Sequence, residues 1–461
     1  MRMRFQYNTL CIIFLSITSI IFSWNGNYEG GDIAAARRSF LGQNPIDLWG
    51  GFSGFFYGTI PNLIFPWGLW LLILQMTCTA AGLILISKHF RFVNKTQHLF
   101  FFTLSYLALS FSGYLTRDST MAAFYILGCG LILFSNKLLR ASDKVIFLTG
   151  TLFIVLSVAF RPWLFFAAVL PILFLRKFNL KILVFTIILI ASPLCIDRVT
   201  YSITDYKKVH PELQVIISDL ASMTCLSSSN EVRENGTELL NRFSNTVYTN
   251  SEICGDFRLN TWQSVGSWSL NPSEIGLEAF NTANTRYSKI LISSDMTSKN
   301  YAEIRNSWLN FITKNPKDYL QAKLIQANQI MISGDTFGLR VLNADSPRNY
   351  LAGLYFIPFD TVISLHLLSP AVTILIGLVI IILWLSKMTI NRLIKNREIA
   401  YSFVFLFFWI IATSIAYIGD NGRYTYLSSF TFYILLFSGI SKINTFSDEK
   451  EILKKNRARF E

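Results

Sequence analysis

Charged residues are scarce in this sequence. They make up 15% of its 461 residues, whereas soluble domains carry about 25%. Hydrophobic residues make up 52% and lie in long blocks, such as 183–194 and 372–385. This composition excludes a soluble enzyme and a disordered chain, and the small numbers of cysteines and glycines exclude a disulfide scaffold and a collagen-like fibre. Because about 20 apolar residues cross the hydrocarbon layer of a bilayer, the sequence predicts an all-α polytopic membrane protein.

Several chemical signatures are also missing. The sequence has no Walker-type phosphate loop and no dinucleotide-binding glycine fingerprint, which argues against nucleotide-driven chemistry. It has no CxxC pair, and its four histidines are scattered, which argues against a zinc site. Cys225 and Cys254 alone lie between predicted spans, 29 positions apart. They are therefore the candidates for a disulfide, whereas the other four cysteines fall within spans.

About ten stretches without Lys, Arg, Asp or Glu are predicted to cross the membrane. The basic start of the first stretch resembles a secretory signal, but WNGNYEGGD after it has no small-x-small cleavage site, so we expect this span to be retained. The stretches are 8–24, 66–87, 97–115, 119–136, 145–160, 162–175, 182–196, 361–386, 399–418 and 424–441.

These spans divide the chain into four predicted parts. Residues 1–196 form an N-terminal membrane module whose first outer loop, 25–65, contains interfacial helices. Residues 197–360 form one large, mainly helical loop domain, 361–441 a C-terminal membrane module, and 442–461 a basic tail. Within the loop domain, helical periodicity predicts two amphipathic helices separated at Asn315-Pro316, packed on the outer surface of the membrane domain.

Sorting the charges by side orients the chain. With the N-terminus inside, the predicted inner segments hold 21 of the 41 Lys and Arg residues and only six acids. This is the bias of the positive-inside rule. It predicts a multi-pass protein of the bacterial inner membrane with both termini in the cytoplasm. The net charge of +13 therefore requires no nucleic acid, and the C-terminal KKNRARF fits a contact with membrane lipids.

The charges near the predicted outer membrane surface form a smaller group. Outside the large loop, every basic residue on this side is an arginine, and acids stand beside several of them. Local ion pairs that finish helix ends are one interpretation. A site for a lipid-linked phosphate is the other, because guanidinium groups bind phosphate bidentately. We favour the site. The residues are Glu29, Asp32, Arg37, Arg38, Arg117, Asp118, Arg161, Asp420 and Arg423.

Carboxylates and guanidinium groups together suit glycosyl transfer from a phosphate-linked sugar. A carboxylate takes the proton from the acceptor hydroxyl as it attacks the anomeric carbon, and positive groups stabilise the departing phosphate. Nucleotide sugars are cytoplasmic, so a donor on the outer side is expected to be a polyprenyl-phosphate-linked sugar. The acceptor is expected to be a glycan or lipid-linked glycan, and the active site to face the periplasm.

Four segments resemble the GT-C superfamily of membrane glycosyltransferases, which includes protein mannosyltransferases, aminoarabinose transferases and O-antigen glucosyltransferases. They are YEGGDIAAARRSF in the first outer loop, RDSTMAAFYILG at the fourth span, FRPW after the fifth and GRYTY before the last. Two features depart from the family. The first loop has a single Asp after Gly-Gly instead of an Asp-Glu pair, and the large loop lies between spans seven and eight.

The resemblance implies a role for each candidate residue. Asp32 matches the family's catalytic acid, and Asp118 is a second acid that would orient the acceptor or bind a divalent metal ion. The residues that would bind the donor phosphate are Arg117, Arg161, Arg423 and Tyr424. Three further charged residues would support the site, namely Glu29, Arg37 and Asp420.

Two other functions fit the same topology. An O-antigen polymerase or ligase also has many spans, one large periplasmic loop and functional arginines, but needs no acid in the first loop. A lipid-glycan flippase or other transporter belongs to a different class and places ionisable residues near the membrane midplane. The predicted spans are almost free of charge, and this favours an enzyme that works at one membrane surface.

Overall fold

The computed structural model is helical throughout the residues that it describes, and no strand occurs among them. Those residues are 2–23, 51–63, 67–90, 95–113, 116–135, 141–169, 180–204, 213–242, 247, 249–255, 298–332, 354–358, 361–362, 369–385, 397–416 and 427–440.

Most of the predicted spans coincide with long apolar helices. These are α1 (Arg2–Ser23), α4 (Trp67–His89), α5 (Lys95–Ser112), α6 (Arg117–Phe134), α7 (Ala141–Ala159), α9 (Leu180–Thr204), α17 (Pro370–Leu385), α19 (Arg397–Ala416) and the helix over 427–440. The stretch predicted as the sixth span begins as the 3-10 helix η2 (Pro162–Val169) after α7, and residues 170–179 lie outside the described part. An additional helix, α3 (Gly51–Leu63), lies in the predicted first outer loop.

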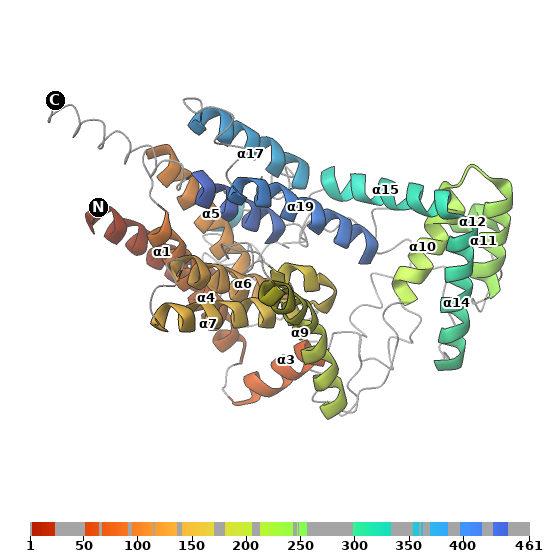
Figure 1. Ribbon diagram of the computed structural model, residues 1–461, viewed down its shortest axis with the longest axis horizontal. Helices are drawn as coiled ribbons and strands as arrows, with labels where there is room; N and C mark the ends of the chain where they lie inside the picture. Colours follow the sequence, from red (N-terminus) through yellow and green to blue (C-terminus); the bar gives the residue numbers. More distant parts are fainter. Residues whose placement is uncertain are drawn as a thin grey trace.

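Four of these helices are long and apolar enough to cross a membrane, judged by length and composition. They are the segments Leu69–His89, Arg117–Phe134, Ala141–Ala159 and Leu183–Ile203. Shorter apolar helices occupy Asn8–Ser23, Pro370–Ile382, Ile399–Ile411 and Leu427–Ile440. The helices pack side by side in one bundle (Figure 1), and many of their exposed side chains are apolar, such as Leu375 and Ile382 at 61% and 66% exposure. These features indicate a membrane-embedded helical protein.

Glycines allow three helices of the bundle to pack at backbone contact. A Cβ atom at Gly130 would stand 2.5 Å from the carbonyl oxygen of Gly82 in α4. One at Gly128 would stand 2.8 Å from the carbonyl oxygen of Gly150 in α7. Only residues without a side chain permit such approach, so α6 is held between α4 and α7. Helix α6 is consequently the most buried of the long helices.

A second hydrophobic core lies outside the bundle, in a helical domain built from α10 (Leu213–Leu226), α11 (Asn230–Arg242), α12 (Asn250–Gly255), α14 (Ser298–Lys314) and the first half of α15 (Pro316–Ile332). A disulfide between Cys225 and Cys254 joins α10 to α12. A buried ion pair of 2.7 Å between Asp219 and Lys323 joins α10 to α15.

The sequence correctly predicts the two helices at Asn315-Pro316. Helix α14 ends at Lys314 and α15 begins at Pro316, because proline lacks the N–H that a first helical residue would leave unpaired in any case. Helix α15 extends from the helical domain to the bundle (Figure 1), where it packs on α17 and α19.

Candidate functional site

The N-terminus of α6 is the centre of the candidate site. Thr116 caps the helix, because its hydroxyl accepts a hydrogen bond of 3.1 Å from the backbone N–H of Ser119. This bond satisfies one of the N–H groups that a helix leaves unpaired at its start. The cap places Arg117 and Asp118 in the first turn, where both are buried, at 7% and 1% exposure.

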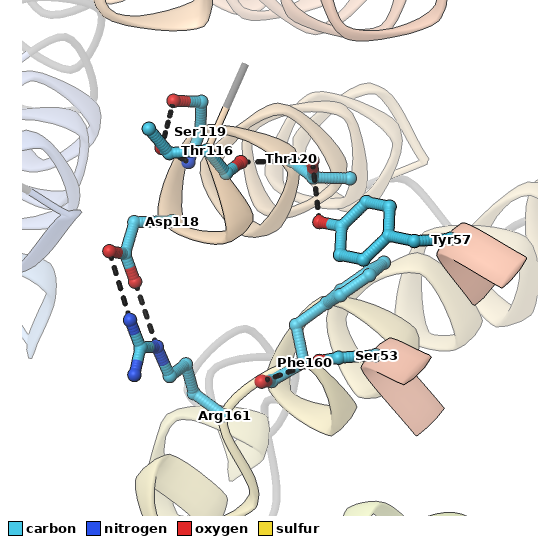
Figure 2. A network of polar contacts seen from close by, with 8 residues as sticks. All are labelled: Ser53, Tyr57, Thr116, Asp118, Ser119, Thr120, Phe160 and Arg161. Atoms are coloured by element: carbon cyan, nitrogen blue, oxygen red, sulfur yellow. Dashed lines mark hydrogen bonds and ion pairs between the residues drawn. The ribbon is translucent and has the colours of Figure 1, made fainter. Parts of the chain in front are cut away.

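Asp118 forms a two-point ion pair with Arg161, which lies in the turn between α7 and η2. Nε of Arg161 donates to one carboxylate oxygen at 2.8 Å, and Nη2 donates to the other at 3.0 Å. Figure 2 shows the planar guanidinium facing the carboxylate. Arg161 is 5% exposed, so the pair is shielded from water on both sides. Two of the charged turns identified in the sequence, RDST and FRPW, therefore meet in space.

The Asp118–Arg161 pair reaches beyond a single turn of the chain. Asp118 contacts an arginine 43 residues away, which ties α6 to the end of α7. The turn Arg161-Pro162 ends α7, because the residue before a proline is disfavoured in the helical conformation.

The hydroxyl of Thr120 is the second centre of the site, one turn further along α6. It accepts hydrogen bonds from the Tyr57 hydroxyl at 2.9 Å and from Nε2 of Gln75 at 2.6 Å, and it donates to the carbonyl oxygen of Thr116 at 3.1 Å. These bonds connect α3, α4 and α6. All three side chains have 0% exposure, so the network is fixed in position.

Tyr57 links this network to the charged residues. Its hydroxyl lies within the electrostatic influence of Arg117, Asp118 and Arg161, and burial raises the pKa of its phenol well above the ordinary value. Tyr57 therefore remains a neutral hydrogen-bond donor. Its ring packs against Phe160, with ring centroids 5.7 Å apart, and Figure 2 shows this ring between Tyr57 and Arg161. The hydroxyl of Ser53 donates to the Phe160 carbonyl oxygen at 3.1 Å.

Asp197 is a residue of the site that the sequence interpretation missed. Its carboxylate accepts a hydrogen bond of 3.3 Å from the backbone N–H of Phe52, at the positive N-terminal end of α3. Arg117 and Arg198 are the cations near it. A Cβ atom at Gly51 would stand 2.7 Å from the Asp197 carbonyl oxygen, so α3 and α9 cross at close range. The available signal was an adjacent acid and arginine, Asp197-Arg198, directly after a predicted span.

The remaining predicted site residues lie outside the described part of the chain. Among the predicted residues that the structure describes, Arg117, Asp118 and Arg161 lie in one region. The two cysteines are joined by the disulfide of the separate helical domain. The undescribed candidates are Glu29, Asp32, Arg37, Asp420, Arg423 and Tyr424.

The described residues do not fit a divalent metal ion. Both carboxylate oxygens of Asp118 accept hydrogen bonds from Arg161, and a metal ligand would have to give up that pairing. Within the described ranges no group of three or more His, Cys, Asp or Glu side chains is placed to hold a metal. We therefore derive no step through a metal.

Comparisons with known proteins add no relative to this picture: no protein-family model, curated protein or solved structure matches the chain.

Proposed function

We propose that the protein is an integral membrane glycosyltransferase, which transfers a sugar from a polyprenyl-phosphate donor to a periplasmic acceptor, a lipid-linked glycan of the cell envelope. The burial of Arg117, Asp118 and Arg161 together at one end of an apolar bundle carries the proposal. Buried charges are costly in a membrane protein, and they are characteristic of sites that bind or react.

The proposed reaction begins at Asp32, in the segment that precedes α3. Its carboxylate takes the proton from the acceptor hydroxyl while the hydroxyl oxygen forms a bond to the anomeric carbon. The bond between that carbon and the phosphate oxygen breaks, and the polyprenyl phosphate leaves with the electron pair. Arg117, Arg423 and Tyr424 would stabilise the charge that develops on this phosphate.

Asp118 and Arg161 act as a unit in this proposal. The carboxylate holds the guanidinium plane in one orientation through two hydrogen bonds, so the guanidinium is preorganised for a donor phosphate next to it. Glu29, Arg37 and Asp420 support the site as neighbouring charges. The structural support for this arrangement is the network of Thr120, which fixes α3 and hence the end of the first loop beside α6.

The proposed topology places the N-terminus of α6 at the periplasmic surface of a bacterial inner membrane, with both chain termini in the cytoplasm. Helices α6 and α7 support it, because they are joined in sequence at the opposite end and both are long enough to span the membrane. The turn containing Arg161 consequently lies on the same side as Asp118.

The test is a comparison of envelope glycans from cells with and without the protein. Cells that lack it should lose one sugar substituent, and Asp32→Asn should reproduce this loss. Asp118→Asn should reduce the transfer, because the amide no longer holds Arg161 by charge. Asp143→Asn, a matched change in the first turn of α7, should leave the glycan unchanged.

Each alternative function predicts a different result. Full activity of Asp32→Asn would count against glycosyl transfer of the GT-C kind. A change in polymer length or in attachment to lipid, without loss of a substituent, would indicate an O-antigen polymerase or ligase. Movement of a lipid-linked glycan across vesicles without covalent transfer would indicate a flippase.

A further inference from the structure

One face of α15 is exposed along three helical turns. Leu320 and Gln321 both lie within four residues of Lys317, Leu324 follows them at spacings of four and three, and Asn328 lies four residues beyond Leu324, so these residues share a side of the helix. Together with Ile325 they line a shallow groove. Leu320 and Leu324 are 59% and 60% exposed, and these two side chains make the centre of the face apolar.

The orientation of this face is fixed by contacts in both halves of α15. Ala322 and Lys323 are buried in the helical domain, where Nζ of Lys323 pairs with the Asp219 carboxylate at 2.7 Å. Further along, Ala327 and Met331 pack against the core of the bundle. Because two separate cores hold the helix, it cannot rotate to hide its leucines without breaking one of them.

The exposed leucines lie a short distance along α15 from the residues that pack on the bundle. Seven residues separate Leu324 from Met331, which corresponds to about 10 Å along a helix. The headgroup region on each side of a bilayer is about 5–8 Å thick, and interfacial helices bury their apolar faces about 5–10 Å into it. The distance from Met331 to Leu324 is therefore comparable to the thickness of a headgroup layer next to the bundle.

The packing partners of α15 also face lipid. Helix α15 lies against α17 and α19, as Figure 1 shows. The exposed side chains of these two helices are large and apolar, among them Ile382 at 66%, Phe407 at 61% and Phe408 at 57%. Helix α15 thus packs on two helices whose exposed side chains are of the kind that acyl chains cover.

We propose that the exposed face of α15 lies in the headgroup region of the adjacent leaflet and binds phospholipid. Leu320 and Leu324 enter the boundary with the acyl chains. Lys317, at the start of the helix, extends its ammonium group to lipid phosphates, as long basic side chains do at membrane surfaces. This contact sets the height of the helical domain above the bilayer. The proposal depends on the membrane bundle and is independent of the proposed sugar transfer.

The experiment measures lipid exposure directly, in the full-length protein reconstituted into phospholipid nanodiscs. Single nitroxide labels are placed at Leu320→Cys and Leu324→Cys, in a background in which the accessible thiols are removed by Cys11→Ala and Cys195→Ala. Collisions of each label with oxygen, which concentrates in lipid, are compared with collisions with a water-soluble nickel chelate. Only variants that remain monodisperse and keep the disulfide of the helical domain are measured.

Two matched labels calibrate the result. Leu309→Cys on α14, where the leucine is 45% exposed, reports the solvent side of the helical domain, and Ile382→Cys on α17 reports lipid. We expect oxygen collisions to exceed nickel collisions at 320 and 324, as at 382, and the order to reverse at 309. Nickel collisions that dominate at 320 and 324, or low collision rates with both reagents, would overturn the proposal.

A charge reversal tests the role of the lysine. In nanodiscs of anionic phospholipid, Lys317→Glu should raise nickel access at position 324, because lipid phosphates repel the new carboxylate. Unchanged access would refute the contact between Lys317 and lipid phosphates.

Discussion

The Asp118–Arg161 pair yields the sharpest prediction about stability. Three variants make a cycle: Asp118→Leu, Arg161→Met, and the two changes together. Each single variant leaves one charge buried without its partner, whereas the double variant removes both charges and fills the space with apolar side chains of similar size. We therefore expect the double variant to be more stable than either single variant.

The expected magnitude follows from the geometry. Two hydrogen bonds of 2.8 and 3.0 Å join the side chains, which are 1% and 5% exposed. Opposite charges about 4 Å apart attract by about 4 kcal/mol at an effective dielectric constant of 20. Removing one member of a buried pair costs about 3–5 kcal/mol, whereas replacing both by apolar residues is often close to neutral. With about 3–5 kcal/mol lost in each single variant and close to zero in the double variant, the coupling free energy, which is the sum of the two single losses minus the double loss, should be about 6–10 kcal/mol.

The assay follows unfolding of detergent-solubilised protein through its buried thiols. Cys78 in α4 and Cys129 in α6 are 6% and 1% exposed, so a thiol-reactive dye labels them only when the bundle opens. The accessible thiols of Cys11 and Cys195 are blocked beforehand. Titration with a denaturing detergent then gives a free energy of unfolding for each variant.

Additivity would refute the reasoning. If the double variant loses as much free energy of unfolding as the sum of the two single variants, the side chains do not stabilise each other across the turn. A double variant that is additive in stability but inactive would mean that the residues act separately in the site.

Three further predictions concern other parts of the molecule. Asp197→Ala should accelerate hydrogen exchange at the Phe52 amide and cost about 1 kcal/mol, as losing a helix cap does; Asp197→Asn should cost less. Cys225→Ser should destabilise the helical domain by roughly 3.6 kcal/mol, the chain-entropy value for a separation of 29 residues, seen as a lower melting temperature. Burial raises the pKa of the Asp219 carboxyl above its ordinary value of 3.8 despite the nearby Lys323. The protonated Asp219 carboxyl therefore makes its full contribution to stability below pH 3.8, and this contribution is lost as the pH rises through the raised pKa. In melting curves followed by fluorescence from about pH 4 to neutral, Asp219→Asn should make the melting temperature depend less on pH.

The helices of the bundle were predictable because a long apolar block bounded by charged residues is compatible with few structures other than a membrane helix. The stretch 66–87 predicts α4, which runs over Trp67–His89, and Asn315-Pro316 predicts the break between α14 and α15. Irregular parts were harder. The apolar run 162–175 was expected to span the membrane, but it begins as the 3-10 helix η2, because periodicity and hydropathy do not distinguish a tight helical turn from a span.

The end of α9 shows a limit of the same rule. The sequence places the end of the seventh span at residue 196, before the first charged residues, but α9 continues to Thr204. Asp197 remains in the helix because its carboxylate is hydrogen-bonded at the N-terminus of α3. Hydropathy treats every charge as exposed to solvent or lipid, and it contains no information about a partner from a distant helix.

The candidate site was predictable as a region but not as a set of contacts. Two helices joined at one end must bring their other ends to the same side of a bundle, so the turns with Asp118 and Arg161 were expected to lie on the same side. Which arginine pairs with Asp118 depends on side-chain direction. The contact with Arg161, which lies in the turn after α7, depends on how that turn is placed against α6, and this placement cannot be inferred from hydropathy or charge alone.

The position of the pair along its helices bears on the choice between an enzyme and a transporter. Asp118 is the second residue of α6, which has 18 residues, so it lies about 11 Å from the middle of that helix. The central turns of α1, α4, α5, α6, α7, α17 and α19, as far as they are described, carry no charged residue. A transporter places its ionisable groups near the midplane, where the substrate crosses. Charges concentrated at one end of the helices instead serve a reaction at one membrane surface, and this location supports the proposed transfer of a sugar over the proposed alternative of transport.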